Sequence, residues 1–226
     1  MRGKLIAFDG VDGCGKSTQV VLLSKVLQQK YPSLDIVITR EPWDVEHNPI
    51  GKRIRSILTN KADRRVWADQ SELNHESLQY LYFLDRCVHY MKLIIPSLEE
   101  NKLVITDRER MVTYAYGLST GVPVQVVSGW HDGMTAPDLY IFTKVSAETA
   151  LLRLRKRNEA NNTDADLWEK EDIVRKNVGN FEKVASLNII KNLEVVDANK
   201  GMTETNDEIL ARVESALSDW LLQFKV

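Results

Sequence analysis

Basic charge is not in excess in this chain of 226 residues, since 30 lysines and arginines face 32 aspartates and glutamates and leave a net charge of -2. A general nucleic-acid binder would usually carry a basic excess, so any anion binding must come from local clusters. Cysteine is scarce as well: Cys14 and Cys87 form neither a disulfide framework nor a metal-binding spacing. A reducing, cytoplasmic setting is the simpler expectation.

Long apolar runs are also missing. No stretch approaches the roughly 20 residues needed to cross a membrane, and residues 1–4 lead directly into a strand-like segment. We therefore expect neither a membrane span nor a signal peptide. The hydrophobic content of 43% and the charged content of 27% are ordinary for a globular protein, and the length suits one domain over residues 1–226.

Strand-like and helix-like stretches alternate, which predicts an α/β fold with a five-stranded parallel sheet flanked by helices. The expected strands lie at 5–8, 36–39, 103–106, 139–142 and 193–196. Expected helices begin near Lys16 and at Asn48-Pro49, cover 71–98 and 147–157, resume around Trp168, and end with one capped by Thr203. Segments 61–72, 117–121 and 158–165 are predicted as loops.

The most informative stretch is Gly10-Val11-Asp12-Gly13-Cys14-Gly15-Lys16-Ser17-Thr18, which fits G-x-x-x-x-G-K-[S/T]. It lies between an expected strand and an expected helix, the context in which this pattern forms a phosphate-binding loop. The glycines let successive backbone N–H groups turn inward, and the start of the helix adds its positive dipole end. Lys16 can then reach the β- and γ-phosphates, and the Ser17 hydroxyl can ligate Mg²⁺.

Charged residues follow the expected strands, at the edge of a parallel sheet where ligands bind. They are Asp9, Arg40, Asp107, Arg108 and Asp197. For Asp107 we favour a role in organising the metal over a helix cap. A carboxylate beside phosphates repels them unless it works through Mg²⁺, a proton or an arginine, so Asp12 is a functional candidate.

Three arginines from separate parts of the chain, Arg40, Arg86 and Arg108, could clamp a second phosphorylated ligand. Taken singly, each is more often a surface ion pair. Together they favour transfer to a phosphate over simple hydrolysis. Tyr82 lies four residues before Arg86, so it could stack on a base, although aromatic residues at helical spacing are as often core. Residues 153–170 are interpreted as a lid, or alternatively as a solvated helix end with a loop.

In their order and spacing these pieces resemble the thymidylate kinase family of nucleoside monophosphate kinases over nearly the whole chain. The resemblance rests on Phe8-Asp9-Gly10, Thr39-Arg40-Glu41-Pro42, Tyr82-Phe83-Leu84-Asp85-Arg86, Thr106-Asp107-Arg108, Ala115-Tyr116, Pro137-Asp138-Leu139 and Asp197-Ala198. It implies an enzyme of nucleotide synthesis that phosphorylates dTMP to dTDP with ATP and Mg²⁺. It also implies a homodimer packed through helices, with the apolar side of the 71–98 helix as a candidate surface.

The resemblance assigns roles to single residues. The loop from Gly10 to Thr18 would hold ATP, with Asp197 near the adenine, and the metal would be served by Ser17, Asp9 and Asp107. The residues implied to bind the acceptor nucleotide are Asp12, Arg40 and Arg108 at its phosphate, Tyr82, Arg86 and Thr113 at its base, and Tyr116 under its deoxyribose. Catalysis would use Lys16, Asp12, Arg40, Arg108 and an arginine of the lid.

Gly13 stands where some members of the family carry a catalytic arginine, so in this chain that arginine would have to come from another segment. Members without it supply one from the lid, for which Arg153, Arg155 and Arg157 are the candidates. Other departures from the family pattern are Trp43 for glycine, Glu109 for an aromatic residue, Val112 for serine, Gly117 for glutamine, Lys144 for aspartate and Leu167 for arginine. The departures near the acceptor pocket leave phosphoryl transfer as the expected reaction and open the choice of base.

Two alternatives to a dTMP kinase therefore stand. One is a kinase for another deoxynucleotide or for a nucleoside, and a nucleoside acceptor would need a general-base carboxylate instead of an arginine clamp. The other is a nucleotide-dependent switch or binding ATPase, which would hydrolyse ATP slowly and respond to a partner.

Overall fold

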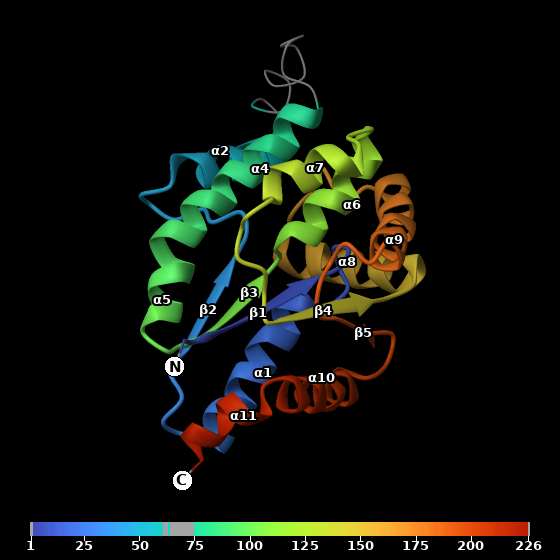
Figure 1. The fold of residues 1–226 in the computed structure, drawn as a ribbon. Coiled ribbons are helices and arrows are strands. Elements are labelled where there is room, and N and C mark those ends of the chain that lie inside the picture. Colours follow the sequence, from blue (N-terminus) through green and yellow to red (C-terminus); the bar gives the residue numbers. More distant parts are fainter. Residues whose placement is uncertain (1, 61–62, 64–74, 226) are drawn as a thin grey trace.

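A parallel five-stranded sheet forms the centre of the computed structural model, which describes residues 2–60, 63 and 75–225 (Figure 1). The strands are β1 Lys4–Asp9, β2 Ile36–Arg40, β3 Leu103–Asp107, β4 Leu139–Lys144 and β5 Leu193–Asp197. They lie in the order β2-β3-β1-β4-β5, and every neighbouring pair is parallel. The predicted α/β fold is confirmed.

Helices cover both faces of this sheet. They are α1 Lys16–Lys30, α2 Pro49–Thr59, α4 His75–His89, α5 Ile95–Glu99, α6 Arg110–Thr120, α7 Val124–His131, α8 Ala147–Asn161, α9 Glu171–Ser186, α10 Met202–Ala216 and α11 Ser218–Leu221. A π-helical segment, Tyr90–Ile94, joins α4 to α5, and a 3₁₀ turn, Leu222–Phe224, follows α11. Among the described residues, no helix is long and apolar enough to cross a membrane.

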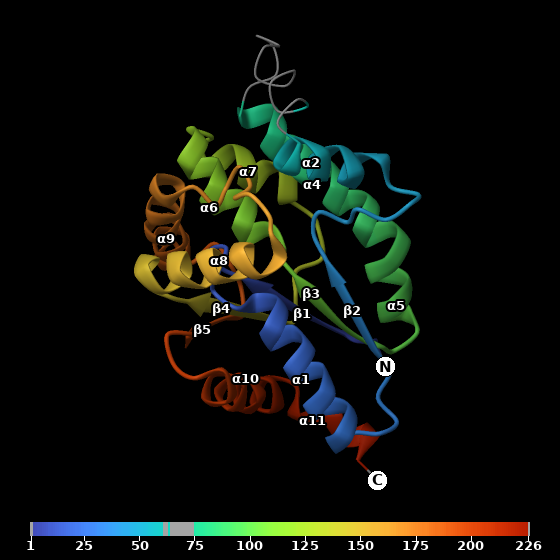
Figure 2. The same ribbon diagram turned by 180° about the vertical axis from the view of Figure 1, so that it is seen from behind.

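The three central strands, β1, β3 and β4, are apolar because both of their faces are buried. Along β1, Ile6 and Phe8 pack against α1 and α10, whereas Ala7 belongs to the core formed with α2, α4, α6, α8 and α9. Figures 1 and 2 show α1, α10 and α11 on one side of the sheet and the other helices on the opposite side. Alternate side chains of a strand point to opposite faces, so each strand needs apolar residues at successive positions.

The helix predicted over 71–98 is interrupted. Residues 71–74 lie outside the described part, α4 ends at His89, and the N–H of Ile95 bonds to the carbonyl of Tyr90 five residues back. Pro96 lacks an N–H and its ring crowds the preceding turn, which gives a local reason for the wider π turn. The loop predicted at 61–72 also lies outside the described residues, apart from Asp63.

Four predicted boundaries were wrong. Helix α6 continues through Gly117 to Thr120 and stops at Gly121, where φ is +85°. Helix α8 continues to Asn161, past the predicted end at 157, because Asn162 caps it in the left-handed conformation. Thr203 is the second residue of α10, whose N-cap is Gly201, and the helix expected near Trp168 begins at Glu171.

Candidate active site

A cavity of about 510 Å³ lies at the carboxyl ends of β1, β2 and β3. Predicted site residues from distant parts of the chain meet there. Those that line it are Asp12, Gly13, Gly15, Lys16, Ser17, Thr18, Arg40, Tyr82, Asp107, Arg108, Tyr116, Arg153 and Arg157. Ligands bind at this edge of open α/β sheets because the loops after the strands converge on it.

The phosphate loop is shaped by its glycines and closed by α8. Gly13 has a φ of +83°, and a Cβ atom there would lie 2.5 Å from the carbonyl oxygen of Ala150 in α8. No side chain, and therefore no arginine, fits at position 13 unless α8 moves. Lys16 is almost fully buried, and its Nζ donates to the carbonyl oxygens of Gly10 at 2.9 Å and Val11 at 3.1 Å.

The Cys14 thiol of the same loop points away from the cavity. Cys14 is 1% exposed, and its Sγ lies 2.9 Å from Thr143 Oγ1 in β4. It is a small core residue of the loop, and the ligand contacts predicted for positions 10, 11 and 14 would be made by their backbone.

Two oxygen donors suit a hard cation next to the loop. The Ser17 hydroxyl is hydrogen-bonded to Asp107 Oδ2, and Asp107 Oδ1 is buried without a partner among the described residues. The described residues contain no group of three His, Cys, Asp or Glu side chains that could hold a metal by themselves, so nucleotide oxygens and water would have to complete the coordination of Mg²⁺. Ser17 and Asp107 fit that requirement.

Asp9, the third predicted metal ligand, is not brought to the cavity. It is fully buried, and its Oδ2 accepts from the backbone N–H of Glu109 at 3.2 Å. Burial and the nearby Glu109 carboxylate raise the pKa of Asp9 well above its usual value. Its Oδ1 is buried without a partner among the described residues, but Asp9 does not line the cavity.

Arg108 and Asp12 form an ion pair at the centre of the cavity. Arg108 has a φ of +80°, and its N–H donates to Phe8 O at 2.8 Å, which fixes the direction in which the side chain leaves the loop. Its Nη1 is buried and has no partner among the described residues. Burial alone would raise the pKa of Asp12, but Arg108 and Lys16 outweigh it and lower the pKa. Asp12 therefore stays ionised beside two cations.

A second set of ion pairs, in which Asp44 binds two arginines, lies on the wall formed by β2 and α2. Arg40 Nη2 donates to Asp44 Oδ1 at 3.2 Å, and Arg55 Nε donates to Asp44 Oδ2 at 3.0 Å. Arg55 lines the cavity and was missed by the sequence analysis. The only sequence signal was that Arg55 lies on the helix that follows the second strand; that it faces the cavity is known from the structure alone.

Aromatic side chains cover the opposite wall. The indole of Trp168 stacks on Tyr116 with a centroid distance of 4.6 Å and an interplanar angle of 10°, and its Nε1 donates to Tyr82 Oη at 3.3 Å. Tyr116 Oη in turn donates to Asp12 Oδ2 at 3.1 Å. The predicted lid thus supplies part of this wall through Asp166, Trp168 and Glu169.

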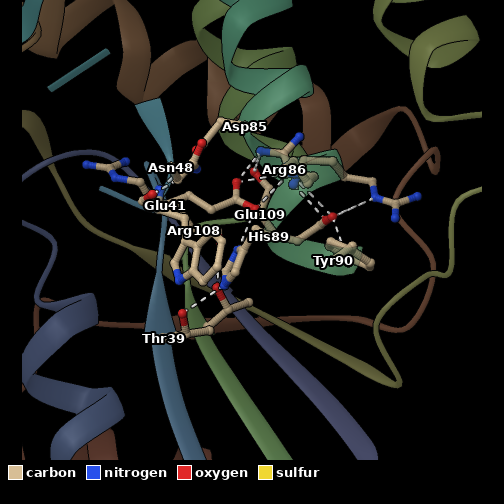
Figure 3. A network of polar contacts seen from close by, with 12 residues as sticks. Thr39, Glu41, Asn48, Asp85, Arg86, His89, Tyr90, Arg108 and Glu109 are labelled. Carbon is tan, nitrogen blue, oxygen red and sulfur yellow. Dashed lines mark hydrogen bonds and ion pairs between the residues drawn. The ribbon is translucent and has the colours of Figure 1, made fainter. Parts of the chain in front are cut away.

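Arg86 is the main predicted residue that the cavity does not receive. It is fully buried, and each of its nitrogens is bonded within the protein. Nε and Nη2 donate to Glu41 at 2.9 and 2.5 Å, and Nη2 also donates to Glu109 O at 2.8 Å. Figure 3 shows Arg86 directed at Glu41 and Glu109. The arginines near the ends of β2 and β3 that line the cavity are therefore Arg40, Arg55 and Arg108.

The remaining donors of Arg86 go to Thr113 and His131. Its Nη1 lies 3.1 Å from Thr113 Oγ1 and 2.6 Å from His131 Nε2. His131 Nδ1 lies 2.8 Å from Val127 O, so Nδ1 carries the proton and Nε2 accepts from Arg86. Burial and Arg86 lower the pKa of His131 to about 4, which keeps the ring neutral. Thr113, predicted at the base, lies behind the cavity with Arg86.

The three lid arginines take different positions. Arg153 lines the cavity and donates to Cys14 O at 3.3 Å and Ala198 O at 2.8 Å. Arg157 also lines it and pairs with Glu169 at 2.5 Å. Arg155 pairs with Glu171 at 3.3 Å, is 66% exposed and does not line this cavity. Arg153 thereby links the phosphate loop to the 197–198 segment.

Asp197, predicted near the adenine, is the exposed last residue of β5 and does not line the cavity. It accepts from the backbone N–H and the side chain of Asn199 at 2.9 and 2.8 Å. Its connection to the site runs through Ala198 and Arg153.

Asp166→Asn is expected to remove a pH dependence of stability. Burial, followed by the Asp12 and Glu169 carboxylates, raises the pKa of Asp166 to about 7, whereas an unfolded aspartate titrates near about 3.9. The folded protein therefore binds this proton more tightly, and the free energy of unfolding falls as pH rises between these two values. Relative to the parent, the variant should gain a few kcal/mol at pH 8 and little at pH 4.

Urea unfolding at pH 4, 6 and 8 measures this difference. Asp207→Asn, an exposed position on α10, is the control and should leave the pH profile unchanged. Parallel pH profiles for Asp166→Asn and the parent would contradict the assignment.

The fold and the cavity define a phosphate-loop protein of the α/β class in which a nucleotide-binding loop and an arginine-rich pocket face each other. A family model described as Thymidylate kinase matches residues 8–209. A probable thymidylate kinase of Pyrococcus abyssi is 29% identical over 96% of this chain and 98% of that protein. The thymidylate kinase of Symbiobacterium thermophilum is 32% identical over 94% of this chain and 93% of that protein. The thymidylate kinase of Caldicellulosiruptor saccharolyticus is 32% identical over 83% of this chain and 85% of that protein.

The chain therefore belongs to the thymidylate kinase family. It is an ATP-dependent phosphotransferase of the family that phosphorylates dTMP. A switch or binding ATPase is not favoured by this membership.

Proposed function

We propose that the cavity binds ATP on the phosphate loop and dTMP on the arginine-lined wall, and that the γ-phosphoryl group passes directly between them. The observation that carries the proposal is that Lys16 of the loop and the guanidinium of Arg108 face the same cavity. Two phosphate groups repel each other, so their approach requires cations on both sides. Simple hydrolysis of ATP would not require the cations on the acceptor side.

The transfer step follows from this arrangement. An oxygen of the dTMP phosphate attacks the γ-phosphorus, and the bond from that phosphorus to the β,γ-bridging oxygen breaks, so that ADP leaves. Lys16 stabilises the charge on the donor phosphates, and Arg108 uses its unpartnered Nη1 for the acceptor phosphate while Nη2 remains on Asp12. No covalent enzyme intermediate is needed, because the nucleophile is already an ionised phosphate oxygen.

Supporting groups orient the two nucleotides. Arg40, held by Asp44, would bind the acceptor phosphate from the wall formed by β2 and α2. Tyr82 would contact the base, and Tyr116 would pack under the sugar. Mg²⁺ held by Ser17 and Asp107 would neutralise charge on the β- and γ-phosphates. Asp166 and Trp168, which line the cavity from the lid, would exclude water from the transferred group.

Release of ADP with a panel of acceptors tests the choice of substrate. dTMP, dUMP, dCMP, dGMP, UMP and thymidine are compared by kcat/KM at fixed ATP and Mg²⁺. The proposal expects dTMP to be the best acceptor and thymidine to be inactive, because the arginines would find no phosphate to bind. Equal rates with all acceptors would contradict dTMP specificity, and activity with thymidine would contradict the phosphate clamp.

Arg157→Met and Arg153→Met are expected to separate catalysis from ATP binding. The Arg157 side chain is 46% exposed and can turn from Glu169 to the transferred phosphoryl group, so its loss should lower kcat about a hundredfold. Arg153 is fixed to the backbone of residues 14 and 198, so its loss should mainly raise KM for ATP. Arg155→Met on the same helix is the matched control and should change neither. Steady-state kinetics that reverse the first two results would exchange the roles.

A homodimer is also part of the proposal, and an apolar stripe supports it. Tyr80, Leu84, Val88, Met91 and Ile95 recur along one side of α4 and α5, and Met91 is 61% exposed. Met91→Glu should convert the dimer to a monomer in sedimentation equilibrium. Leu222→Glu, which is 58% exposed at the other end of the fold, is the control. A parent protein that sediments as a monomer would contradict this part of the proposal.

We retain the cytoplasmic location as a proposal. It is supported by the chain's two free cysteines, Cys14 and Cys87.

A further inference from the structure

Asp44, in the loop between β2 and α2, binds two arginines of the cavity at once. Its Oδ1 accepts from Arg40 Nη2 at 3.2 Å, and its Oδ2 accepts from Arg55 Nε at 3.0 Å. Both arginines line the cavity, whereas Asp44 does not. The carboxylate thus joins two cavity arginines without forming part of the wall itself.

The two arginines come from separate elements and would not stay together unaided. Arg40 is the last residue of β2, its side chain is 63% exposed, and Arg55 lies on α2. Two like charges on one wall repel each other, and long side chains with many rotamers spread into solvent. A carboxylate that binds both offsets the repulsion and restricts their rotamers.

The backbone next to Asp44 is held by buried groups. The N–H of Trp43 donates to Asp85 Oδ2 at 2.8 Å, and its carbonyl accepts from Asn48 Nδ2 at 2.9 Å. Asn48 also donates to Asp85 (Figure 3). The Trp43 indole stacks on His89 with a centroid distance of 5.2 Å. The turn that carries Asp44 is therefore fixed on α4, and its carboxylate has a defined place from which to hold the arginines.

The Asp44 carboxylate is ionised. Burial alone would raise its pKa, but Arg55 and Arg40 outweigh burial and lower the pKa. A phosphate monoester loses its second proton near pH 6, so Asp44 already carries its charge where the acceptor phosphate is a dianion. Both arginines are thus paired with a full negative charge under those conditions.

The contacts with Asp44 leave part of each guanidinium for a ligand. Asp44 engages Arg40 through Nη2 and Arg55 through Nε, whereas a guanidinium has five N–H donors on three nitrogens. Phosphate oxygens accept from arginine in pairs. A phosphate in the cavity can therefore bind both arginines while Asp44 continues to hold them.

We propose that Asp44 is a positioning residue that holds Arg40 and Arg55 side by side on the cavity wall before the acceptor phosphate arrives. Prior ordering lowers the conformational entropy lost when the phosphate binds, so its benefit appears as affinity for the acceptor. The inference rests on the proposed function, since the phosphate concerned is that of the acceptor nucleotide. It does not depend on which base the acceptor carries.

Asp44→Asn tests the proposal through steady-state kinetics with dTMP and ATP. The KM for dTMP should rise about tenfold, because the arginines must be ordered by the substrate itself. Once bound, the phosphate holds them, so kcat should change by less than about twofold and the KM for ATP should stay unchanged. The melting temperature should change little, since partly exposed ion pairs contribute little to stability.

Two further variants separate positioning from charge alone. Asp44→Glu keeps the carboxylate, and the arginine side chains can adjust to one more methylene, so it should restore most of the affinity for dTMP. Glu46→Gln removes the same charge from an exposed position of the same loop and is the matched control, for which no change is expected.

Four results would overturn the inference alone, in a parent enzyme that shows dTMP-dependent ADP release. An unchanged KM for dTMP in Asp44→Asn would make the contacts an inert surface ion pair, and a lower KM would mean that Asp44 competes with the phosphate. An equal rise in Glu46→Gln would point to the general field of the loop. A lower melting temperature with both KM values raised would make Asp44 merely structural. A parent that releases no ADP with any nucleoside monophosphate would overturn the proposed function, and this inference with it.

Discussion

Lys16→Met is expected to lower kcat by about a thousandfold, which corresponds to about 4 kcal/mol of lost transition-state stabilisation. The Lys16 ammonium is almost fully buried and lies against the carbonyls of Gly10 and Val11, where water screens its charge poorly. Negative charge spreads over the transferred oxygens during phosphoryl transfer, so a cation fixed there acts more strongly on the transition state than on the ground state.

Single-turnover transfer at saturating ATP and dTMP measures this effect without interference from product release. Thermal unfolding must accompany it, because two loop carbonyls lose their donor and stability should fall by roughly 1–3 kcal/mol. Lys25→Met, an exposed lysine of the same helix α1, is the matched control and should leave both measurements unchanged. A decrease of less than tenfold in a folded Lys16→Met protein would show that the loop backbone alone carries the donor phosphates.

Arg108→Met should have the second largest effect, a loss of about a thousandfold in kcat/KM for dTMP with little change in the KM for ATP. Arg108 is the cation that faces the cavity from the end of β3, and its Nη1 is buried without a partner in the part of the chain that the structure describes. A phosphate oxygen is the acceptor it lacks. The loss should fall on the acceptor because Lys16 and the phosphate loop, which would hold ATP, remain in place.

The same substitution leaves the Asp12 carboxylate buried beside Tyr116 without its main counterion. Breaking a buried ion pair on one side costs roughly 3–5 kcal/mol, so urea unfolding should show a large loss of stability. In the parent, the pKa of Asp12 is lower in the folded than in the unfolded protein. The ionised Asp12 therefore contributes to stability above its unfolded pKa, and this contribution is lost as the pH falls through its folded pKa. Asp12→Asn added to Arg108→Met should recover stability without recovering activity. If the double variant is no more stable than Arg108→Met, the two residues are not energetically coupled.

Local sequence signals were sufficient for most of the fold and for the donor half of the site. The strands could be predicted because β1, β3 and β4 are buried on both faces and must be apolar at successive positions. The phosphate loop could be predicted because glycine spacing, Lys16 and Ser17 act within one short segment. Asp107 and Arg108 followed from the rule that ligands bind beyond strand ends.

Positions that depend on distant partners could not be predicted. Helical spacing correctly put Arg86 on the face of Tyr82, but two carboxylates from separate loops, Glu41 and Glu109, bind it in the interior. The sequence marked Glu109 as unusual, yet nothing in its spacing revealed that it pairs with Arg86 and Arg110, which outweigh burial and lower its pKa to about 2.

The prediction of where α8 ends was wrong for a different reason. Its last turn contains residues with weak helix propensity, but Asn162 caps the helix and Asn158 bonds to Glu169 at 3.0 Å. Such a tertiary contact outweighs propensity, and it also fixes Arg157 at the cavity edge. That Arg153 and Arg157 line the cavity, and Arg155 does not, could be known only from the direction of each side chain.

The fate of the γ-phosphoryl group tests the central claim most directly. ATP labelled at the γ-phosphorus is incubated with the protein, Mg²⁺ and dTMP, and the products are separated by charge. The account predicts one labelled dTDP for each ADP formed, with no label on the protein and little inorganic phosphate. Label recovered as inorganic phosphate at the same rate with and without dTMP would contradict it.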